Sequence, residues 1–181
     1  MKHIFCACCG QKLTLHLAGD DGLVPYCEAC KKFWFDSFST CIIVLITNEN
    51  GEELLLRQNY LSKQHATIVS GYMKTCENAE QAARREVMEE VGICLPRMRY
   101  VGSCWFDSSE LLMLGYIGYA KTKEIRLSEE VDEAVWVAAE DAAQYVVPKT
   151  RNSPVHMLLE AYLAEKSGTD QSMKDDINGL I

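Results

Sequence analysis

The segment from Asn78 to Val91 constrains the fold of this chain more than any other, because it carries a complete set of helix signals. Asn78 is suited to cap the first turn, and Gln81 follows three residues later, as in a capping box. Gly92 comes directly after the segment, where helices commonly end. Alanines and valines at positions 79, 83, 87 and 91 form a stripe along one side. We therefore predict a helix whose apolar face packs against a core.

Strand signals lie on both sides of this helix. A β-branched run covers residues 41–47, a turn follows at 48–53, and residues 54–58 return as the second strand of a hairpin. Further strands are expected over 66–71, 98–106, 111–120 and 135–137, and a second amphipathic helix over 155–166. Strands interleaved with two helices predict an α/β sandwich with a mixed sheet.

Four cysteines near the N-terminus form two CxxC pairs separated by seventeen residues: Cys6 with Cys9, and Cys27 with Cys30. This spacing suits a four-thiolate zinc ribbon built around a short hairpin-like segment. Such a site has no open position, so the zinc would be structural and would supply folding energy to a segment too small for its own core. Reduced, metal-free cysteines and a redox CxxC are the alternatives.

The other five cysteines are expected to be thiols without a structural role. Cys8 could replace a neighbour in the cluster, but the form CxxCG, which ends at Gly10, favours Cys9 as the ligand. Ordinary buried or partly buried thiols are expected at positions 41, 76, 94 and 104. An odd total of nine cysteines, in a chain whose first residues show no export signal, argues against a disulfide framework and favours the cytoplasm.

Length and charge limit the organisation and the partners. The 181 residues allow one main core with a small appendage, and we expect a zinc ribbon over 1–36, the main domain over 37–166 and a polar tail over 167–181. Apolar runs are too short to cross a membrane, so no membrane partner is expected. A net charge of −8 repels a phosphate backbone, so nucleic acid is not expected as a partner. Anionic small substrates would need metal ions as intermediaries.

Three glutamates near the end of the predicted helix, Glu86, Glu89 and Glu90, fall within a sector of roughly 100°. Like charges at this spacing destabilise a helix, and the negative end of the helix dipole adds to the cost. A divalent cation such as Mg²⁺ or Mn²⁺ would explain them, because it binds clustered carboxylate oxygens. The alternative is a solvated acidic face.

The surrounding residues favour the metal. Gly71, five residues, Glu77, seven residues and the run from Arg85 to Ile93 (REVMEEVGI) match the Nudix box at every defined position, so the sequence resembles the Nudix hydrolases. This resemblance implies an α/β/α sandwich in which a loop-helix-loop carries Mg²⁺. It also implies an enzyme that acts on acid anhydrides in phosphorus-containing substrates and cleaves a nucleoside diphosphate linked to another group.

The resemblance also implies roles for individual residues. Glu86 and Glu90 would ligate metal, Glu89 would be a further ligand or the base for the attacking water, and Arg85 would hold a glutamate in place. One more metal ligand is expected from the loop SEEVDEAVW, at Glu130 or, as the competing choice, at Glu133. A solvated acidic loop is the alternative for this segment.

A zinc ribbon directly ahead of a Nudix domain is similar to the NADH pyrophosphatase branch, as are the stretches CIIVLI, REVMEEVGI and YVGS. The branch implies hydrolysis of an NADH- or NAD-like dinucleotide to two mononucleotides. Its SQPWPFPxS signature corresponds here to SCWFDSSEL, in which the prolines are absent. ADP-ribose and FAD therefore remain alternative substrates. A nucleotide sensor or nucleic-acid adaptor that binds without cleaving is the alternative of another class.

Three aromatic residues are candidates for stacking on a base or a nicotinamide: Tyr72, Trp105 and Phe106. Aromatic residues at strand ends are as often part of a core, so both interpretations stay open for them. The resemblance also implies that a homodimer is an alternative to a monomer, with the hydrophobic FWF stretch of residues 33–35 as a contributor to its interface.

Overall fold

The computed structural model describes residues 3–121 and 123–168. The chain divides into two compact units, Met1–Ser39 and Thr40–Ile181. The predicted polar tail over 167–181 lies outside the described residues from position 169 onward. Of the helices within the described ranges, none is long and apolar enough to cross a bilayer.

The N-terminal unit contains a small antiparallel sheet. Its strands are β1 (Thr14–Leu17), β2 (Leu23–Cys27) and β3 (Lys32–Phe33), in the order β1-β2-β3. A single 3₁₀ turn, η1 (Gly19–Asp21), joins β1 to β2. The hairpin-like segment predicted between the two CxxC pairs is therefore confirmed as β1 and β2. The third, very short strand carries the chain onward from the second pair.

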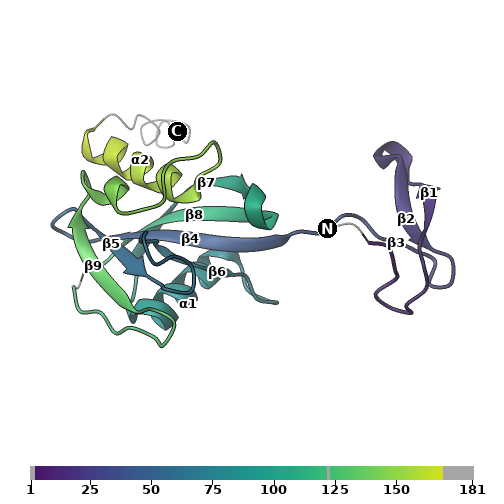
Figure 1. The fold of residues 1–181 in the computed structure, drawn as a ribbon, viewed down its shortest axis with the longest axis horizontal. Coiled ribbons are helices and arrows are strands. Elements are labelled where there is room, and N and C mark those ends of the chain that lie inside the picture. The colour runs from purple at the N-terminus through teal and green to yellow at the C-terminus, as the bar shows by residue number, and fades with distance from the viewer. Residues whose placement is uncertain (1–2, 122, 169–181) are drawn as a thin grey trace, which may run out of the picture. The chain divides into compact units, whose positions relative to one another are not determined.

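The second unit is built on a six-stranded sheet (Figure 1). Its strands are β4 (Ser39–Thr47), β5 (Glu52–Arg57), β6 (Val69–Tyr72), β7 (Arg97–Phe106), β8 (Leu111–Tyr119) and β9 (Glu133–Ala138). The order is β7-β8-β4-β5-β9, and β6 pairs with β4 beside this path. Two short 3₁₀ segments, η2 (Asp107–Ser109) and η3 (Ala142–Gln144), lie in the connections.

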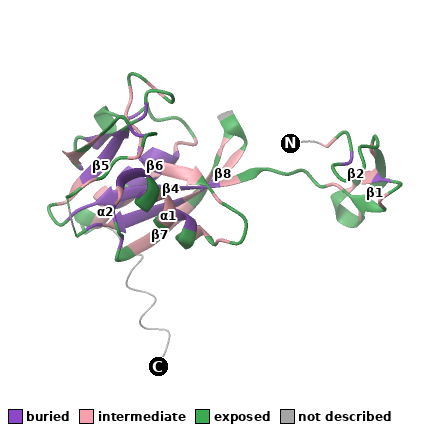
Figure 2. Ribbon diagram, turned by 90° about the horizontal axis from the view of Figure 1, so that it is seen from below, coloured by how far each residue is buried: buried purple, intermediate pink, exposed green. Residues whose placement is uncertain are grey.

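Helices α1 (Ala79–Val91) and α2 (Pro154–Lys166) cover opposite faces of this sheet (Figure 1). The central strand β4 shows the consequence, because its side chains alternate between two separate cores. Ile42, Val44 and Ile46 pack in the cluster that includes the apolar residues of α1. Cys41, Ile43 and Leu45 pack in the cluster that includes Leu158 and Leu159 of α2. Residues 41–47 of β4 are all buried (Figure 2). A strand buried on both faces reads as a near-continuous apolar run, as residues 41–46 do. The predicted α/β/α sandwich is confirmed.

Helix α1 begins and ends at the predicted residues. The side chain of Asn78 accepts a hydrogen bond of 2.8 Å from the backbone N–H of Gln81, and the Gln81 side chain accepts one of 2.9 Å from the backbone N–H of Asn78. Gly92 adopts a left-handed conformation with φ of 68° at the end of the helix. The buried stripe differs in part from the prediction, because Ala79 is half-buried while Ala82 and Glu90 are buried.

Two of the thiols expected to be buried or partly buried are exposed, so that prediction was wrong for Cys76 and Cys94. Both lie in loops at the ends of α1, where the chain runs over the surface. Cys76 also has a positive φ of 68°, which turns the backbone just before the helix. Cys41 is buried and Cys104 is half-buried, as predicted.

Candidate functional site

A pocket of about 340 Å³ lies between the end of α1 and the loop that precedes β9. Its lining consists of five carboxylates and one hydroxyl: Glu86, Glu89, Glu90, Ser128, Glu129 and Glu130. The three predicted helix glutamates thus face one space, with graded burial. Glu90 is only 5% exposed, the side chain of Glu86 is largely covered, and that of Glu89 is 51% exposed. A simple solvated face would expose all three.

Arg85 holds this region together through all five of its N–H donors. Its Nε and Nη2 atoms donate hydrogen bonds of 2.9 and 2.7 Å to the two carboxylate oxygens of Glu77. Its Nη1 bonds Glu86 at 2.6 Å and Glu89 at 2.9 Å, and Nη2 also reaches the carbonyl oxygen of Tyr72 at 3.1 Å. Hydrogen bonding to Arg85 lowers the pKa of Glu77 to about 2. Arg85 is therefore a fixed hub between the loop and the helix.

Among the carboxylates that line the pocket, Glu90 has the least favourable surroundings for a negative charge. Burial, followed by repulsion from Glu86 and Glu130, raises the pKa of Glu90 to about 8. The side-chain amide of Gln58, which directly follows β5 and is itself 3% exposed, lies 3.5 Å from a Glu90 oxygen. A cation beside Glu90 would favour its ionised form and relieve this repulsion. Gln58 was not among the residues predicted from the sequence, although a polar residue after an apolar run was the available signal.

The glycine at position 71 is required because the strand and the helix α1 are in close contact there. A Cβ atom at this position would lie 2.1 Å from the carboxyl carbon of Glu86 and 2.3 and 2.5 Å from its oxygens. Gly71 pairs with Ile42 in the β6–β4 ladder, so its backbone has no room to retreat. The glycine that begins the motif is therefore what allows the Glu86 carboxylate to lie against the strand.

The loop before β9 supplied two candidates for a further metal ligand. Glu130 lines the glutamate pocket. Glu133 lies in β9 and pairs with Arg57 at 3.5 Å. The geometry therefore favours Glu130 over Glu133. Ser128, which lines the same pocket, was not identified from the sequence.

The three aromatic candidates do not lie together. Tyr72 ends β6 and is 59% exposed, close to the hub because its carbonyl binds Arg85. Trp105 is 38% exposed, and its neighbour Phe106 packs with the cluster on the α2 face of the sheet. Successive side chains of a strand point to opposite faces, so Trp105 and Phe106 cannot both face one ligand. The core interpretation is favoured for Phe106.

The ligand atoms of the glutamates are spread along their pocket. Within the described residues, the one set of three or more candidate ligands whose atoms all lie within 4.8 Å of one another is made of cysteines. The glutamates nevertheless offer the hard oxygen donors that Mg²⁺ and Mn²⁺ prefer, around a space large enough for an ion and a phosphate. The donor chemistry of this pocket fits such an ion, with rotation of the exposed Glu89 and Glu130 side chains.

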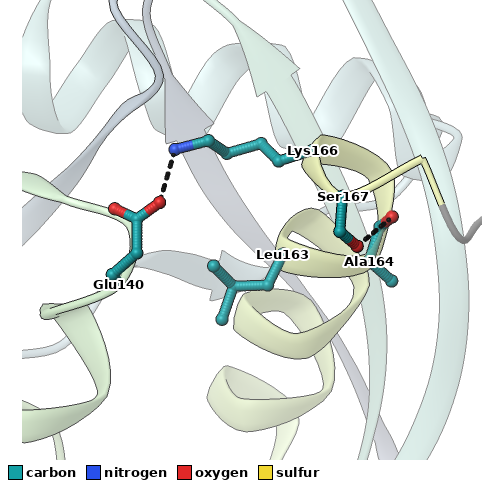
Figure 3. Close-up of a pocket in the computed structure, with 5 residues that line it drawn as sticks. All are labelled: Glu140, Leu163, Ala164, Lys166 and Ser167. Atoms are coloured by element: carbon teal, nitrogen blue, oxygen red, sulfur yellow. Dashed lines mark hydrogen bonds and ion pairs between the residues drawn. The ribbon is translucent and has the colours of Figure 1, made fainter.

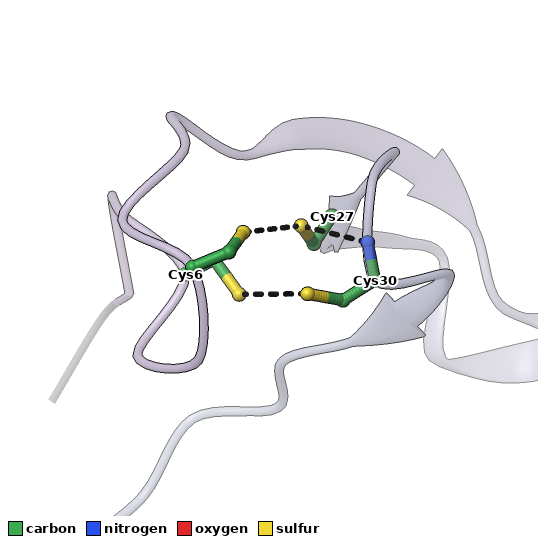
Figure 4. Close-up of side chains that lie close together, drawn as sticks. Cys6, Cys27 and Cys30 are labelled. Atoms are coloured by element: carbon green, nitrogen blue, oxygen red, sulfur yellow. Dashed lines mark hydrogen bonds between the residues drawn. The ribbon is translucent and has the colours of Figure 1, made fainter.

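The cysteine cluster consists of the four predicted thiols, Cys6, Cys9, Cys27 and Cys30. Figure 4 labels three of them, Cys6, Cys27 and Cys30. The sulfur atoms of Cys6 and Cys30 are 3.8 Å apart, and those of Cys9 and Cys27 are 3.5 Å apart. A disulfide needs about 2.05 Å, whereas a tetrahedral zinc site with Zn–S bonds of about 2.3 Å separates its sulfurs by about 3.8 Å. The cluster is therefore compatible with zinc. Cys8 is exposed and lies outside it.

A second hollow, of about 510 Å³, lies at the end of α2 (Figure 3). It is lined by Glu140, Leu163, Ala164, Lys166 and Ser167. Lys166 donates a hydrogen bond of 2.9 Å to Glu140, so its two charged residues neutralise each other. The hollow shares no lining residue with the glutamate pocket and contains none of the residues singled out from the sequence.

Comparison with known proteins places this site in a family. The NUDIX domain matches residues 38–159. A protein named NAD-capped RNA hydrolase NudC from Pseudomonas syringae pv. tomato is 32% identical over 173 residues, covering 94% of this chain and 59% of that protein. A protein of the same name from Stutzerimonas stutzeri is 32% identical over 92% of this chain and 58% of its own length. The chain thus spans somewhat less than three fifths of the length of these relatives.

Solved structures with the same fold are more distant in sequence. A crystal structure of a NUDIX hydrolase from Nitrosomonas europaea has a TM-score of 0.72 at 16% identity and covers 93% of this chain and 94% of that chain. The NUDIX domain of Shewanella oneidensis NrtR, solved with ADP ribose, has a TM-score of 0.58 at 13% identity over 78% of this chain and 94% of that chain. The matched domain, the motif around Arg85 and the α/β/α architecture agree, and the chain belongs to the NUDIX family.

Proposed function

We propose that this protein is a magnesium-dependent pyrophosphohydrolase that cleaves the diphosphate bond of an NAD-like dinucleotide and releases two mononucleotides. The observation that carries the proposal is the position of Glu90, a buried carboxyl whose pKa is raised to about 8 in a pocket lined by four further carboxylates. This arrangement costs stability on its own, since like charges repel and Glu90 loses hydration. A divalent cation bound with a diphosphate offsets both costs.

Three residues would hold Mg²⁺ or Mn²⁺: Glu86 and Glu90 from α1, and Glu130 from the loop before β9. When bound, the ion neutralises phosphate oxygens and lowers the pKa of a coordinated water. It also allows a protein of net charge −8 to bind an anion. Mn²⁺ is an equivalent choice, because both ions take oxygen ligands.

Glu89 is the residue we assign as the base, with a further metal ligand as its alternative role. It is half-exposed, so water can reach it, and its carboxylate can accept the proton of the water that attacks phosphorus. Arg85 bonds both Glu86 and Glu89, and it keeps the ligand and the base at a fixed separation. The attacking oxygen forms a bond to phosphorus while the bridging oxygen leaves with one mononucleotide.

The substrate's ring systems would stack on exposed aromatic side chains. Tyr72 is exposed at the end of β6, directly after the glycine that contacts Glu86, and Trp105 is partly exposed near the end of β7. Stacking on an aromatic ring contributes about 1–3 kcal/mol per base. We include Tyr72 and Trp105 in the substrate site and leave Phe106 in the core.

The relatives named NAD-capped RNA hydrolase support NAD as the dinucleotide, and ADP-ribose or FAD is the nearest alternative because both share the adenosine diphosphate portion. Their name also joins NAD to RNA, whereas the net charge of −8 opposes binding of an RNA backbone. We therefore propose the free dinucleotide as substrate, and NAD-capped RNA is included in the test. A sensor that binds without hydrolysis is the second candidate.

For the N-terminal unit we infer a structural zinc held by the four clustered thiolates, within a ribbon domain over 1–36 ahead of a NUDIX domain over 37–166. The sulfur separations of 3.5 and 3.8 Å support this inference. Metal analysis of the purified protein tests it: about one zinc per chain is expected. A cytoplasmic location and a homodimer remain predictions from the sequence, and light scattering tests the latter.

One experiment separates the functions. The purified protein is incubated with Mg²⁺ and, separately, with NADH, NAD, FAD, ADP-ribose and NAD-capped RNA, and the products are identified chromatographically. The proposal predicts two mononucleotides from NADH or NAD, and loss of the reaction when Mg²⁺ is chelated. It also predicts that the turnover rate of Glu90→Gln is lower by about 10³-fold or more. Binding of a dinucleotide without turnover would favour the sensor.

A further inference from the structure

Within the described residues, two cations form ion pairs with carboxylates of the glutamate pocket: Arg85 and Lys74. The two side chains differ in how readily they can bind a further ligand. All five donors of Arg85 are already engaged, so it cannot bind a ligand without giving up a bond to Glu77, Glu86, Glu89 or the carbonyl oxygen of Tyr72. Lys74 is 61% exposed, and its Nζ lies 3.5 Å from an oxygen of Glu89.

The backbone of Lys74 is fixed although its side chain is not. Its N–H donates to the carboxylate of Glu77, which Arg85 in turn holds. The preceding residue, Met73, donates its N–H to the carbonyl oxygen of Thr40 at 3.0 Å. A flexible four-carbon stem therefore starts from a defined point beside α1 and ends in a charge at the mouth of the pocket.

The pair that this charge makes is easily exchanged. Ion pairs between exposed side chains contribute little, because water screens them and two long side chains must be ordered. Glu89, the partner, is 51% exposed. A phosphate oxygen beside the pocket would be a stronger acceptor for the ammonium, which binds phosphates as a compact point charge.

We propose that Lys74 is a substrate-binding residue whose ammonium moves from Glu89 to an oxygen of the bound diphosphate. This assignment rests on the proposed function. A merely solvated lysine would not contribute to the affinity for a diphosphate.

The test compares Lys74→Gln and Lys74→Arg with Lys123→Gln, which removes a half-exposed lysine that pairs with Glu52. The first measurement is the affinity for Mn²⁺ in the absence of nucleotide. The concentration of the free ion is read from its electron paramagnetic resonance signal. Loss of the ammonium should tighten Mn²⁺ binding about two- to fivefold in Lys74→Gln alone. The second is calorimetric binding of methylenediphosphonate, an uncleavable diphosphate, at saturating Mn²⁺.

For the diphosphonate we expect about tenfold weaker binding in Lys74→Gln and values within about threefold of the unaltered protein in Lys74→Arg and Lys123→Gln. Equal diphosphonate affinity in Lys74→Gln and the unaltered protein overturns the proposal, even if Mn²⁺ binding tightens, because Lys74 would then only neutralise Glu89. Lack of diphosphonate binding by the unaltered protein overturns it too. Circular dichroism checks folding, and Lys74→Met serves as a second neutral variant if Lys74→Gln does not fold.

Neither measurement requires turnover, so the two proposals fail separately. A protein that cleaves dinucleotides but binds the diphosphonate equally well with and without Lys74 keeps the proposed function and loses this inference. A protein that shows the Lys74 effect but cleaves none of the dinucleotides keeps the inference about diphosphate binding and loses the hydrolase.

Discussion

Replacing Gly71 with alanine adds one methyl group where the structure has no space for it. The new Cβ would lie 2.1 Å from the carboxyl carbon of Glu86, well inside the 3.4 Å of ordinary contact. The strand cannot retreat, because Gly71 is paired with Ile42 in the ladder between β6 and β4. Glu86 must therefore give way, and with it the 2.6 Å bond that it accepts from Arg85.

The size of the effect follows from this displacement. The carboxylate must move by about 1 Å or more to restore normal contact, and an error of that size in a catalytic group costs about 100-fold in rate. We expect turnover of NAD or NADH to fall about 100-fold in Gly71→Ala. The free energy of unfolding should change by no more than about 2 kcal/mol, because the clash is with the end of a rotatable side chain.

The assay measures turnover, Mn²⁺ affinity and the urea unfolding curve of the same preparation. Gly102→Ala is the matched control: it is also a strand glycine of this sheet, and its added methyl would meet only the Met157 sulfur, at an ordinary 3.7 Å. The turnover and the Mn²⁺ affinity of Gly102→Ala should stay within about threefold of those of the unaltered protein. If Gly71→Ala retains both turnover and Mn²⁺ affinity at that level, Glu86 does not act from the position described above, and the reasoning is refuted.

Three further predictions concern other parts of the molecule. Glu53 is fully buried, its oxygens lack a hydrogen-bond partner among the described residues, and burial raises its pKa to about 8. Glu53 is neutral in the native state, and its ionisation therefore opposes folding. Its contribution to the free energy of unfolding is fully present below about pH 4.5 and is lost as the pH rises from there through 8, by up to about 1.4 kcal/mol per pH unit. Urea unfolding across this range should show a weaker fall in Glu53→Gln, and identical slopes would contradict this. Glu130→Gln should weaken Mn²⁺ binding about tenfold or more while Glu133→Gln leaves it unchanged, and the reverse order in a titration would reassign the ligand. Cys27→Ser should lose the zinc found by metal analysis, and full retention of zinc would remove Cys27 from the site.

Local signals predicted the helix and the strands of the main unit well. The capping box of α1 and its terminal glycine depend only on residues near in sequence, and both are confirmed. The apolar run in β4 also predicted a strand directly. The small strand β3 was missed because two residues, Lys32 and Phe33, carry too little periodicity to be recognised.

The site shows where reasoning from sequence ends. The motif spacing identified the glutamates, but their graded burial depends on how α1 packs on the sheet. Glu90 was predicted to share an acidic face and is instead almost completely buried. Gln58 and Lys74 come from other strands and loops, and only the tertiary structure brings them to Glu90 and Glu89. In contrast, the separation of Trp105 from Phe106 follows from the two-residue period of a strand and could have been predicted.

The central claim is that the acidic end of α1 binds divalent ions together with a diphosphate. The most direct test is a crystal of the protein grown with Mn²⁺ and methylenediphosphonate, examined by anomalous scattering. The account predicts at least one anomalous peak about 2.1 Å from carboxylate oxygens of Glu86 and Glu90, with a diphosphonate oxygen as another ligand. A fully occupied diphosphonate bound elsewhere, or Glu86 and Glu90 without a peak at saturating Mn²⁺, would contradict it.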